Sequence, residues 1–197
     1  MRSLKLKKFS LVLASSSPRR KKLLSGLRVP FKISSTPVPE KRKRGESPFR
    51  LVRRLALQKA RVAAGRFRSG PSLVIGADTV VVLKGKIFGK PRSPRHAAAM
   101  LMKLSGKTHR VYTGVAVVNS MTSESLSAVD VSRVEFRRIT LREAVRIGKK
   151  HPDKSGSYAC QDERDNLVRR IKGDWQTVVG LPIRTVKRLL TRMEARS

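Results

Sequence analysis

The sequence predicts an α/β protein with a mixed, twisted sheet flanked by helices in a two-lobed arrangement. Short apolar runs alternate with segments of helical spacing along the whole chain, without internal repeats. Several apolar runs follow one another through short turns, so part of the sheet must be antiparallel. Val, Leu, Ile and Phe form about 27% of the 197 residues, which is enough for a folded core despite a net charge of +33.

Each expected element has a local signal. Runs rich in Val and Ile predict strands, whereas apolar residues recurring every three or four positions predict helices. The Ser-Pro pairs at 47–48 and 93–94 offer an N-cap followed by a proline, and Thr140 to Glu143 form a capping box. These signals predict strands over 10–15, 31–34, 73–83, 87–88, 111–119, 125–136 and 168–171, and helices over 21–24, 47–66, 93–104, 140–149 and from 181 onwards.

Length and cysteine content limit the class of protein. The length favours a single domain over 1–197, with a core over about 10–192. The single cysteine, Cys160, excludes an intramolecular disulfide framework and fits a reducing cytoplasm. The basic N-terminus has too short an apolar run for a signal peptide, so we interpret it as a strand. No run approaches the roughly 18 apolar residues of a membrane span.

The charge balance is the most unusual feature of the composition. There are 46 Lys and Arg against 13 Asp and Glu, and the pI is about 11.8. Such a surface attracts anions such as nucleotides, RNA or acidic lipid, but attraction alone does not define a site. The basic residues are spread along the chain, and Lys41 to Arg44 form a dense run. That run is either a solvated loop or a nucleic-acid or targeting patch.

The segment LASSSPRR, over 13–20, combines features of an anion site. Ser17 is placed to cap a helix whose first residue is Pro18, so free backbone N–H groups lie near three hydroxyls and two guanidinium groups. Arginine suits phosphate because its guanidinium can donate two parallel hydrogen bonds. A capped surface helix in an arginine-rich protein would look similar, so the segment alone leaves both interpretations open.

Asp78 lies inside an otherwise apolar strand, GADTVVV over 76–82. Burying a carboxylate is costly unless it is paired, hydrogen-bonded or bound to a cation. Two interpretations follow. Asp78 either has a chemical role, as a ligand of Mg²⁺ or an acceptor of a proton from water, or is satisfied by backbone groups at a strand end.

Two turn-rich segments near the C-terminus, 156–161 and 178–183, are of the kind that lines a cleft beside a sheet edge, but neither defines a reaction. His96, His109 and His151 are scattered, and we expect each to be a surface or structural residue. Cys160 is expected to be a packing residue, since no oriented Cys/His pair is apparent.

In this order, the segments resemble the Maf family of nucleoside triphosphate pyrophosphatases, which is structurally akin to the inosine triphosphate pyrophosphatases. The resemblance extends from Leu13 to Leu190. It rests on LASSSPRR, Glu40 after a Pro-rich strand exit, ALQKA, GADTVV, GKP, LSGKTHRVYTGVAV, DKSGSYACQ and GDWQTVVGLPI. It implies hydrolysis of a nucleoside triphosphate between the α and β phosphates, with Mg²⁺ or Mn²⁺ as cofactor.

The resemblance also implies roles for residues that match the family's motifs. The triphosphate would be bound by Ser15, Ser17, Arg19, Arg20, Lys59 and Lys90. Cations at such positions neutralise the charge that develops during phosphate chemistry. Asp78 matches the proposed base of the family, and together with Glu40 it would hold the metal.

Two sets of residues bear on the choice of substrate. One branch of the family acts on dTTP and UTP, and another acts on 7-methyl-GTP. The pyrimidine branch carries arginine after the first Ser-Pro, where the other branch carries tryptophan, and a Thr-His pair after LSG. Arg19 and the pair 108–109 therefore resemble the pyrimidine branch. Thr79 and Gln161 match positions associated with base selection, and an amide can both donate to and accept from a pyrimidine edge.

The sequence leads to one main hypothesis and one alternative. The main hypothesis is a cytoplasmic pyrophosphatase of dTTP and UTP, with modified pyrimidine nucleotides as further candidates, which limits incorporation of non-standard nucleotides. The resemblance suggests a homodimer, and no membrane partner is expected. The alternative is a basic nucleic-acid-binding protein on the same fold without turnover. The charge of +33 also favours non-specific binding of nucleic acid alongside the enzyme activity.

Overall fold

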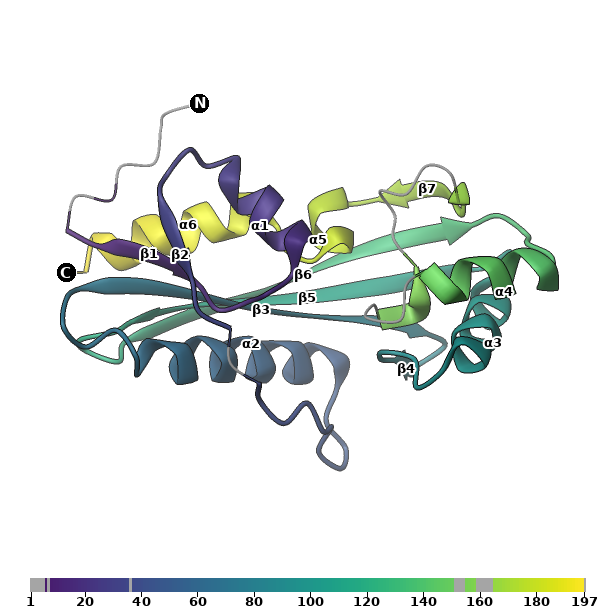
Figure 1. The fold of residues 1–197 in the computed structure, drawn as a ribbon, viewed down its shortest axis with the longest axis horizontal. Coiled ribbons are helices and arrows are strands. Elements are labelled where there is room, and N and C mark those ends of the chain that lie inside the picture. The colour runs from purple at the N-terminus through teal and green to yellow at the C-terminus, as the bar shows by residue number, and fades with distance from the viewer. Residues whose placement is uncertain (1–5, 7, 36, 151–154, 159–164, 197) are drawn as a thin grey trace. The chain divides into compact units, whose positions relative to one another are not determined.

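The computed structural model describes residues 6, 8–35, 37–150, 155–158 and 165–196. None of the described helices is long and apolar enough to cross a membrane. The helices and strands labelled in Figure 1 are β1 (Ser10–Leu13), α1 (Pro18–Ser25), β2 (Phe31–Ile33), α2 (Pro48–Ala64), β3 (Ser72–Leu83), β4 (Lys86–Phe88), α3 (Pro94–Leu104), β5 (Thr108–Asn119), β6 (Ser125–Phe136), α4 (Leu141–Lys150), β7 (Val168–Lys172), α5 (Trp175–Val179) and α6 (Ile183–Glu194). A 3-10 turn, η1 (Ser155–Ser157), lies between α4 and β7 in the chain.

The strands form a mixed sheet, which confirms the predicted fold class. Their order is β2-β1-β3-β5-β6-β7, and β4 pairs with β3 outside this path. β1 is parallel to β2 and β3, whereas β4 is antiparallel to β3 and β7 is antiparallel to β6. The chain divides into two compact units, as the expected two lobes require. Unit 1 comprises Met1–Asp78, Thr113–Asp130 and Gly180–Ser197, and unit 2 comprises Thr79–Tyr112 and Val131–Val179.

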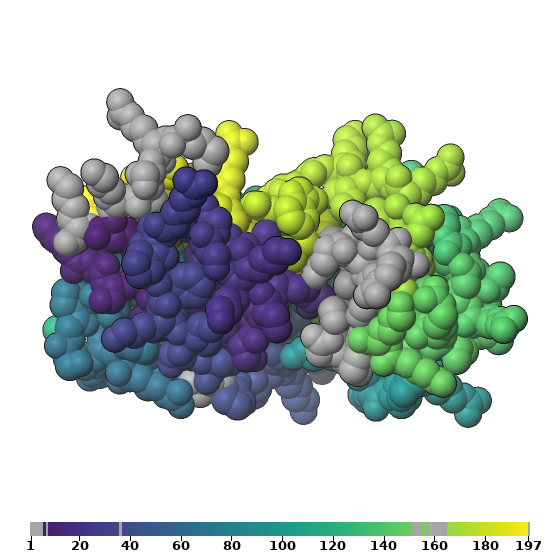
Figure 2. Space-filling view, turned by 45° about the horizontal axis from the view of Figure 1, so that its top comes forward, coloured from purple at the N-terminus to yellow at the C-terminus, as the bar shows by residue number. Residues whose placement is uncertain are grey.

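The central strands of unit 1 are apolar on both faces. Leu11 and Leu13 of β1 pack in one cluster with α1 and α6, whereas Val12 and Ala14 pack in another cluster with α2. Successive side chains of a strand point to opposite faces, so a strand covered on both sides must be apolar throughout. Figure 1 shows α2 on one side of these strands and α1 and α6 on the other. In the space-filling view of Figure 2, the purple surface is formed by the N-terminal part of the chain, which includes α1.

Two glycines let α2 lie very close to the strands of unit 1. A Cβ atom on Gly76 of β3 would stand 2.1 Å from the carbonyl oxygen of Ala56, and one on Gly114 of β5 would stand 2.3 Å from that of Val52. A side chain cannot occupy so small a gap, so the backbone of α2 rests directly on these two positions. This close approach matters for the site below, because α2 and β3 each supply one of its charged groups.

The predicted helix starts have the expected hydrogen bonds. The hydroxyl of Ser47 accepts from Arg50 N at 3.3 Å, and that of Ser93 accepts from His96 N at 3.1 Å. Thr140 and Glu143 form the capping box, each N–H donating to a side-chain oxygen of the other. Some bounds differ: β1 ends at Leu13 rather than at 15, β5 begins three residues earlier than expected, and α6 begins at Ile183 rather than at 181. The sequence does not predict η1 and α5, because three and five residues are too few to show a helical period.

Unit 2 has its own core, in which three rings meet. His109, Phe136 and Tyr158 lie edge to face, with centroids 4.7 to 5.5 Å apart. His109 is 2% exposed, and its Nε2 lies 2.9 Å from the hydroxyl oxygen of Tyr158. Burial lowers the pKa of His109 to about 4. His109 is therefore structural, as expected, whereas His151 and Cys160 lie outside the described residues.

Candidate functional site

An ammonium group between two carboxylates forms the centre of the candidate site, and all three groups belong to unit 1. Lys59 Nζ lies 2.6 Å from Asp78 Oδ1 and 2.7 Å from Glu40 Oε1. Lys59 projects from α2, Asp78 from β3, and Glu40 from the segment between β2 and α2. The side chain of Asp78 is 9% exposed and that of Glu40 is 40% exposed, so one carboxylate is enclosed and the other faces solvent.

The environment of Asp78 favours proton acceptance. Burial raises the pKa of Asp78 above its ordinary value, while the Lys59 ammonium and the Arg20 guanidinium act in the opposite direction. A carboxylate with a raised pKa is a stronger base than an ordinary aspartate, and general bases of enzymes are tuned in this way. The buried Asp in an apolar strand thus has a charged partner, rather than backbone groups alone.

Arg20 connects three segments of unit 1 around Asp78. Its Nε donates to the carbonyl of Gly180 at 2.9 Å, and its Nη1 donates to the carbonyl of Ala77 at 2.9 Å and to Ser15 Oγ at 3.4 Å. Burial lowers the pKa of Arg20, and the Asp78 carboxylate opposes this effect. Because Ala77 directly precedes Asp78, Arg20 fixes the backbone from which the carboxylate projects.

The turn between β1 and α1 differs in one respect from expectation. Pro18 is the first residue of α1 and Ser17 stands at the N-cap, as predicted. The side chain of Ser17, however, makes no capping hydrogen bond, so that part of the prediction is wrong. The N–H of Ser17 instead donates to Ser15 Oγ at 3.3 Å, which turns the loop back on itself. The hydroxyl of Ser17 therefore accepts no hydrogen bond from the first-turn N–H groups of α1.

The other predicted site residues are distributed over both units. Arg19 is half-buried on α1 in unit 1. Thr79 follows Asp78 in β3 but belongs to unit 2, where its carbonyl accepts from Ser155 Oγ at 2.9 Å. Lys90 is exposed in unit 2, after β4. Gln161 lies outside the described residues.

Two acceptors around Arg20 were not identified from the sequence as part of the site. The carbonyls of Ala77 and Gly180 carry no side-chain signal, because any residue supplies a carbonyl. The turn-rich segment 178–183 did indicate a cleft-lining role, and Gly180 adopts a φ of +110° there, which favours glycine. The importance of Gly76 could not be foreseen either, since it depends on how closely α2 packs.

The chemistry of the two carboxylates fits a divalent cation. Within the described residues, no group of three or more His, Cys, Asp or Glu side chains could hold a metal ion. Mg²⁺ in nucleotide enzymes is usually bound by one or two carboxylates, with substrate phosphates and waters completing the shell. Glu40 and Asp78 are two such carboxylates, and in this structure both accept a hydrogen bond from Lys59 Nζ.

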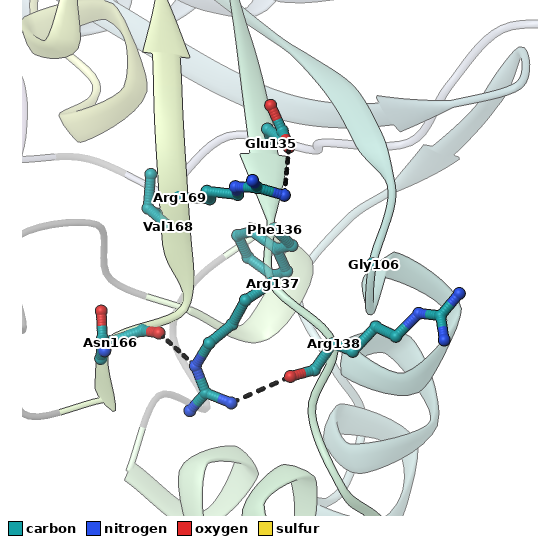
Figure 3. Close-up of a pocket in the computed structure, with 8 residues that line it drawn as sticks. All are labelled: Gly106, Glu135, Phe136, Arg137, Arg138, Asn166, Val168 and Arg169. Atoms are coloured by element: carbon teal, nitrogen blue, oxygen red, sulfur yellow. Dashed lines mark hydrogen bonds and ion pairs between the residues drawn. The ribbon is translucent and has the colours of Figure 1, made fainter.

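Unit 2 contains a pocket of about 510 Å³ that none of the predicted site residues lines. Figure 3 shows that two of its three arginines, Arg137 and Arg169, turn toward protein partners. Arg137 donates to two main-chain carbonyls and to Glu143, and Arg169 lies 3.5 Å from Glu135. These cations serve local structure. The lining residues are Gly106, Glu135, Phe136, Arg137, Arg138, Asn166, Val168 and Arg169.

Comparison with known proteins identifies the family. The model of the family described as Maf-like protein matches residues 10–193, and the chain belongs to this family. A dTTP/UTP pyrophosphatase of Moorella thermoacetica is 44% identical over 183 residues, covering 91% of this chain and 93% of the relative. A dTTP/UTP pyrophosphatase of Photorhabdus laumondii is 40% identical over 188 residues, covering 94% of this chain and 95% of the relative. A solved HAM1 protein of Coxiella burnetii matches 93% of this chain and 99% of its own, with 16% identity and a TM-score of 0.47.

Proposed function

We propose that this protein is an enzyme that hydrolyses nucleoside triphosphates between the α and β phosphates. The observation that carries the proposal is the enclosed Asp78 carboxylate, with a raised pKa and an ammonium partner at 2.6 Å. Membership of the Maf-like family and the names of the relatives support it. The alternative without turnover is not favoured, because this charged group is intact.

The proposed reaction is an attack by water on the α phosphorus. Asp78 accepts a proton from the attacking water while the water oxygen bonds to the α phosphorus. The bond between the α phosphorus and the oxygen that bridges it to the β phosphorus breaks. The products are a nucleoside monophosphate and pyrophosphate. Lys59 stabilises the carboxylate form of Asp78 through its hydrogen bond. Arg20 holds the strand backbone beside Asp78, so the base stays in place during the reaction.

The triphosphate carries four negative charges or nearly so, and its binding requires several cations. We propose that Ser15, Ser17, Arg19, Arg20, Lys59 and Lys90 bind its phosphates. A divalent ion, Mg²⁺ or Mn²⁺, held by Glu40 and Asp78 would supply further charge neutralisation when bound.

We further propose that dTTP and UTP are the preferred substrates, with modified pyrimidine nucleotides as further candidates. Arg19, Thr79 and Gln161 would select the base. We also propose that the protein acts in the cytoplasm and as one domain over 1–197. A homodimer stays a prediction, which sedimentation equilibrium of the purified protein would test.

Release of pyrophosphate from a panel of triphosphates, with Mg²⁺ or Mn²⁺, tests both parts of this proposal. We expect faster release from dTTP and UTP than from purine triphosphates and 7-methyl-GTP. A folded protein that releases no pyrophosphate from any of them would refute the activity. Faster release from 7-methyl-GTP would leave the activity standing and refute the assignment of the base.

A further inference from the structure

The segment 41–68 carries eleven Lys and Arg residues and a single acid, Glu46. Most of its cations lie at the surface of unit 1, in the loop before α2 and on the solvent side of that helix. We define the basic face of α2 as seven exposed residues: Lys41, Arg42, Lys43, Arg44, Arg50, Arg53 and Arg61. Within the described part of the chain, no ion pair joins any of them to a carboxylate.

The carboxylate of Glu46 is turned inward. It holds the loop in place and does not pair with the side chains of the exposed cations at 41–44. The residue is 8% exposed, and its carboxylate accepts from Arg54 Nε at 2.6 Å, from Arg54 Nη2 at 2.8 Å and from Lys43 N at 3.0 Å. Arg54 Nη2 also donates to the carbonyl of Lys41 at 3.1 Å. Arg42 Nε donates to the carbonyl of Glu46 at 2.7 Å. The loop is therefore tied to itself and to the first turns of α2, and Lys41, Lys43 and Arg44 are exposed on it.

The helical part of the face forms a stripe. With 100° and 1.5 Å per residue, Arg50, Arg53 and Arg61 fall within about 80° of arc and span about 16 Å along the axis. One strand of a nucleic-acid duplex carries a phosphate about every 3.4 Å of its length, so this span faces about five phosphates. The three residues are arginines, whose planar guanidinium groups match phosphate oxygens in pairs.

The same face is poorly suited to a lipid surface. A helix that binds a membrane inserts its apolar side, but the apolar side of α2, including Leu51, Val52 and Leu55, is buried in unit 1. The exposed apolar side chains of α2 are Phe49 and Val62, at 46% and 42% exposure. Two exposed side chains provide little apolar area for insertion, whereas seven exposed cations are available to phosphates.

We propose that the basic face of α2 binds the phosphate backbone of nucleic acid without sequence preference. This binding would be separate from nucleotide hydrolysis, since none of the seven residues belongs to the candidate site. According to this proposal, part of the high net charge acts at one defined surface, the basic face of α2, and not only through general attraction of anions.

Titration of a labelled 20-base-pair DNA duplex of mixed sequence tests this proposal, with affinity followed by fluorescence anisotropy at several salt concentrations. The test variant carries Lys43→Gln, Arg50→Gln and Arg61→Gln. The matched control carries Arg184→Gln, Arg188→Gln and Arg192→Gln, three exposed residues of α6 that remove the same charge. Circular dichroism and dTTP turnover show that both variants are folded.

We expect the α2 variant to bind at least about tenfold more weakly at 100 mM salt, and its slope of log K against log salt to be shallower by about 2.7. The α6 variant should stay within about twofold of the wild type, because charges more than about 10 Å from the ligand are screened at this salt. Equal losses in both variants, or none in the α2 variant, would overturn the proposal. So would a loss confined to vesicles containing phosphatidylserine, with duplex binding unchanged.

Discussion

Lys59 on α2 donates to Asp78 on β3 over 2.6 Å, and both side chains are largely enclosed. A buried carboxylate with a cationic partner can remain charged where an isolated one would take up a proton. This pair explains how an acid can stand inside an apolar strand. The ammonium group comes from α2 and the proposed catalytic base from β3. The position of α2 on the sheet therefore affects the chemistry of Asp78.

Replacement of Lys59 should alter the pH profile as well as the rate. Lys59→Gln removes the ammonium that lowers the pKa of Asp78, so burial acts on this pKa with less opposition. We expect kcat/KM for dTTP to fall at least about 10²-fold and its acid limb to move to higher pH. The control, Lys103→Gln, removes an exposed lysine of α3. An acid limb at its original pH would contradict the coupling of Lys59 to Asp78.

The close approach of α2 to β3 can be tested at Gly76. Gly76→Ala places a Cβ atom 2.1 Å from the carbonyl oxygen of Ala56, so the helix has to move. We expect the free energy of unfolding to fall by about 1–3 kcal/mol and turnover to fall with it, because Lys59 is displaced. At Gly65 the nearest atom would be 3.7 Å away, and Gly65→Ala should therefore be tolerated. Urea unfolding of both variants distinguishes the two sites.

Substitution of Arg20 separates positioning from phosphate binding. Arg20→Lys keeps the positive charge but cannot donate to Ala77 and Gly180 together as the guanidinium does. If Arg20 holds the backbone of Asp78, kcat should fall at least about tenfold. A rise in KM with unchanged kcat would show that Arg20 only binds substrate. Arg184→Lys, on the exposed side of α6, is the matched control.

Much of the fold could be predicted from local patterns. The mixed sheet followed from apolar runs, and the helix starts at Ser47 and Ser93 followed from capping chemistry. Asp78 was distinguished by its apolar surroundings in the sequence alone, whereas Glu40 and Lys59 came from family resemblance. The carbonyl partners of Arg20 were not foreseen, because Gly180 is 160 residues away and contributes no side chain. Long-range packing of this kind has no local signal.

The buried imidazole of His109 should make stability depend on pH. Its pKa is about 4 in the folded protein and 6.5 in an ordinary setting, so the unfolded state takes up a proton first as the pH falls. Stability is therefore lost between about pH 6.5 and pH 4, by up to about 3 kcal/mol. His109→Gln keeps a hydrogen-bonding group for Tyr158 without titrating in this range. Urea unfolding across these pH values should show a smaller decrease for this variant than for the wild type.

The role of Asp78 as the base is the central claim, and one comparison tests it most directly. Pyrophosphate release from dTTP is measured for the wild type, for Asp78→Asn, and for Glu124→Gln, which removes a partly exposed carboxylate of unit 1. We expect Asp78→Asn to lower kcat at least about 10²-fold while circular dichroism stays unchanged, and Glu124→Gln to retain the wild-type rate. Turnover by folded Asp78→Asn at the wild-type rate would contradict the claim.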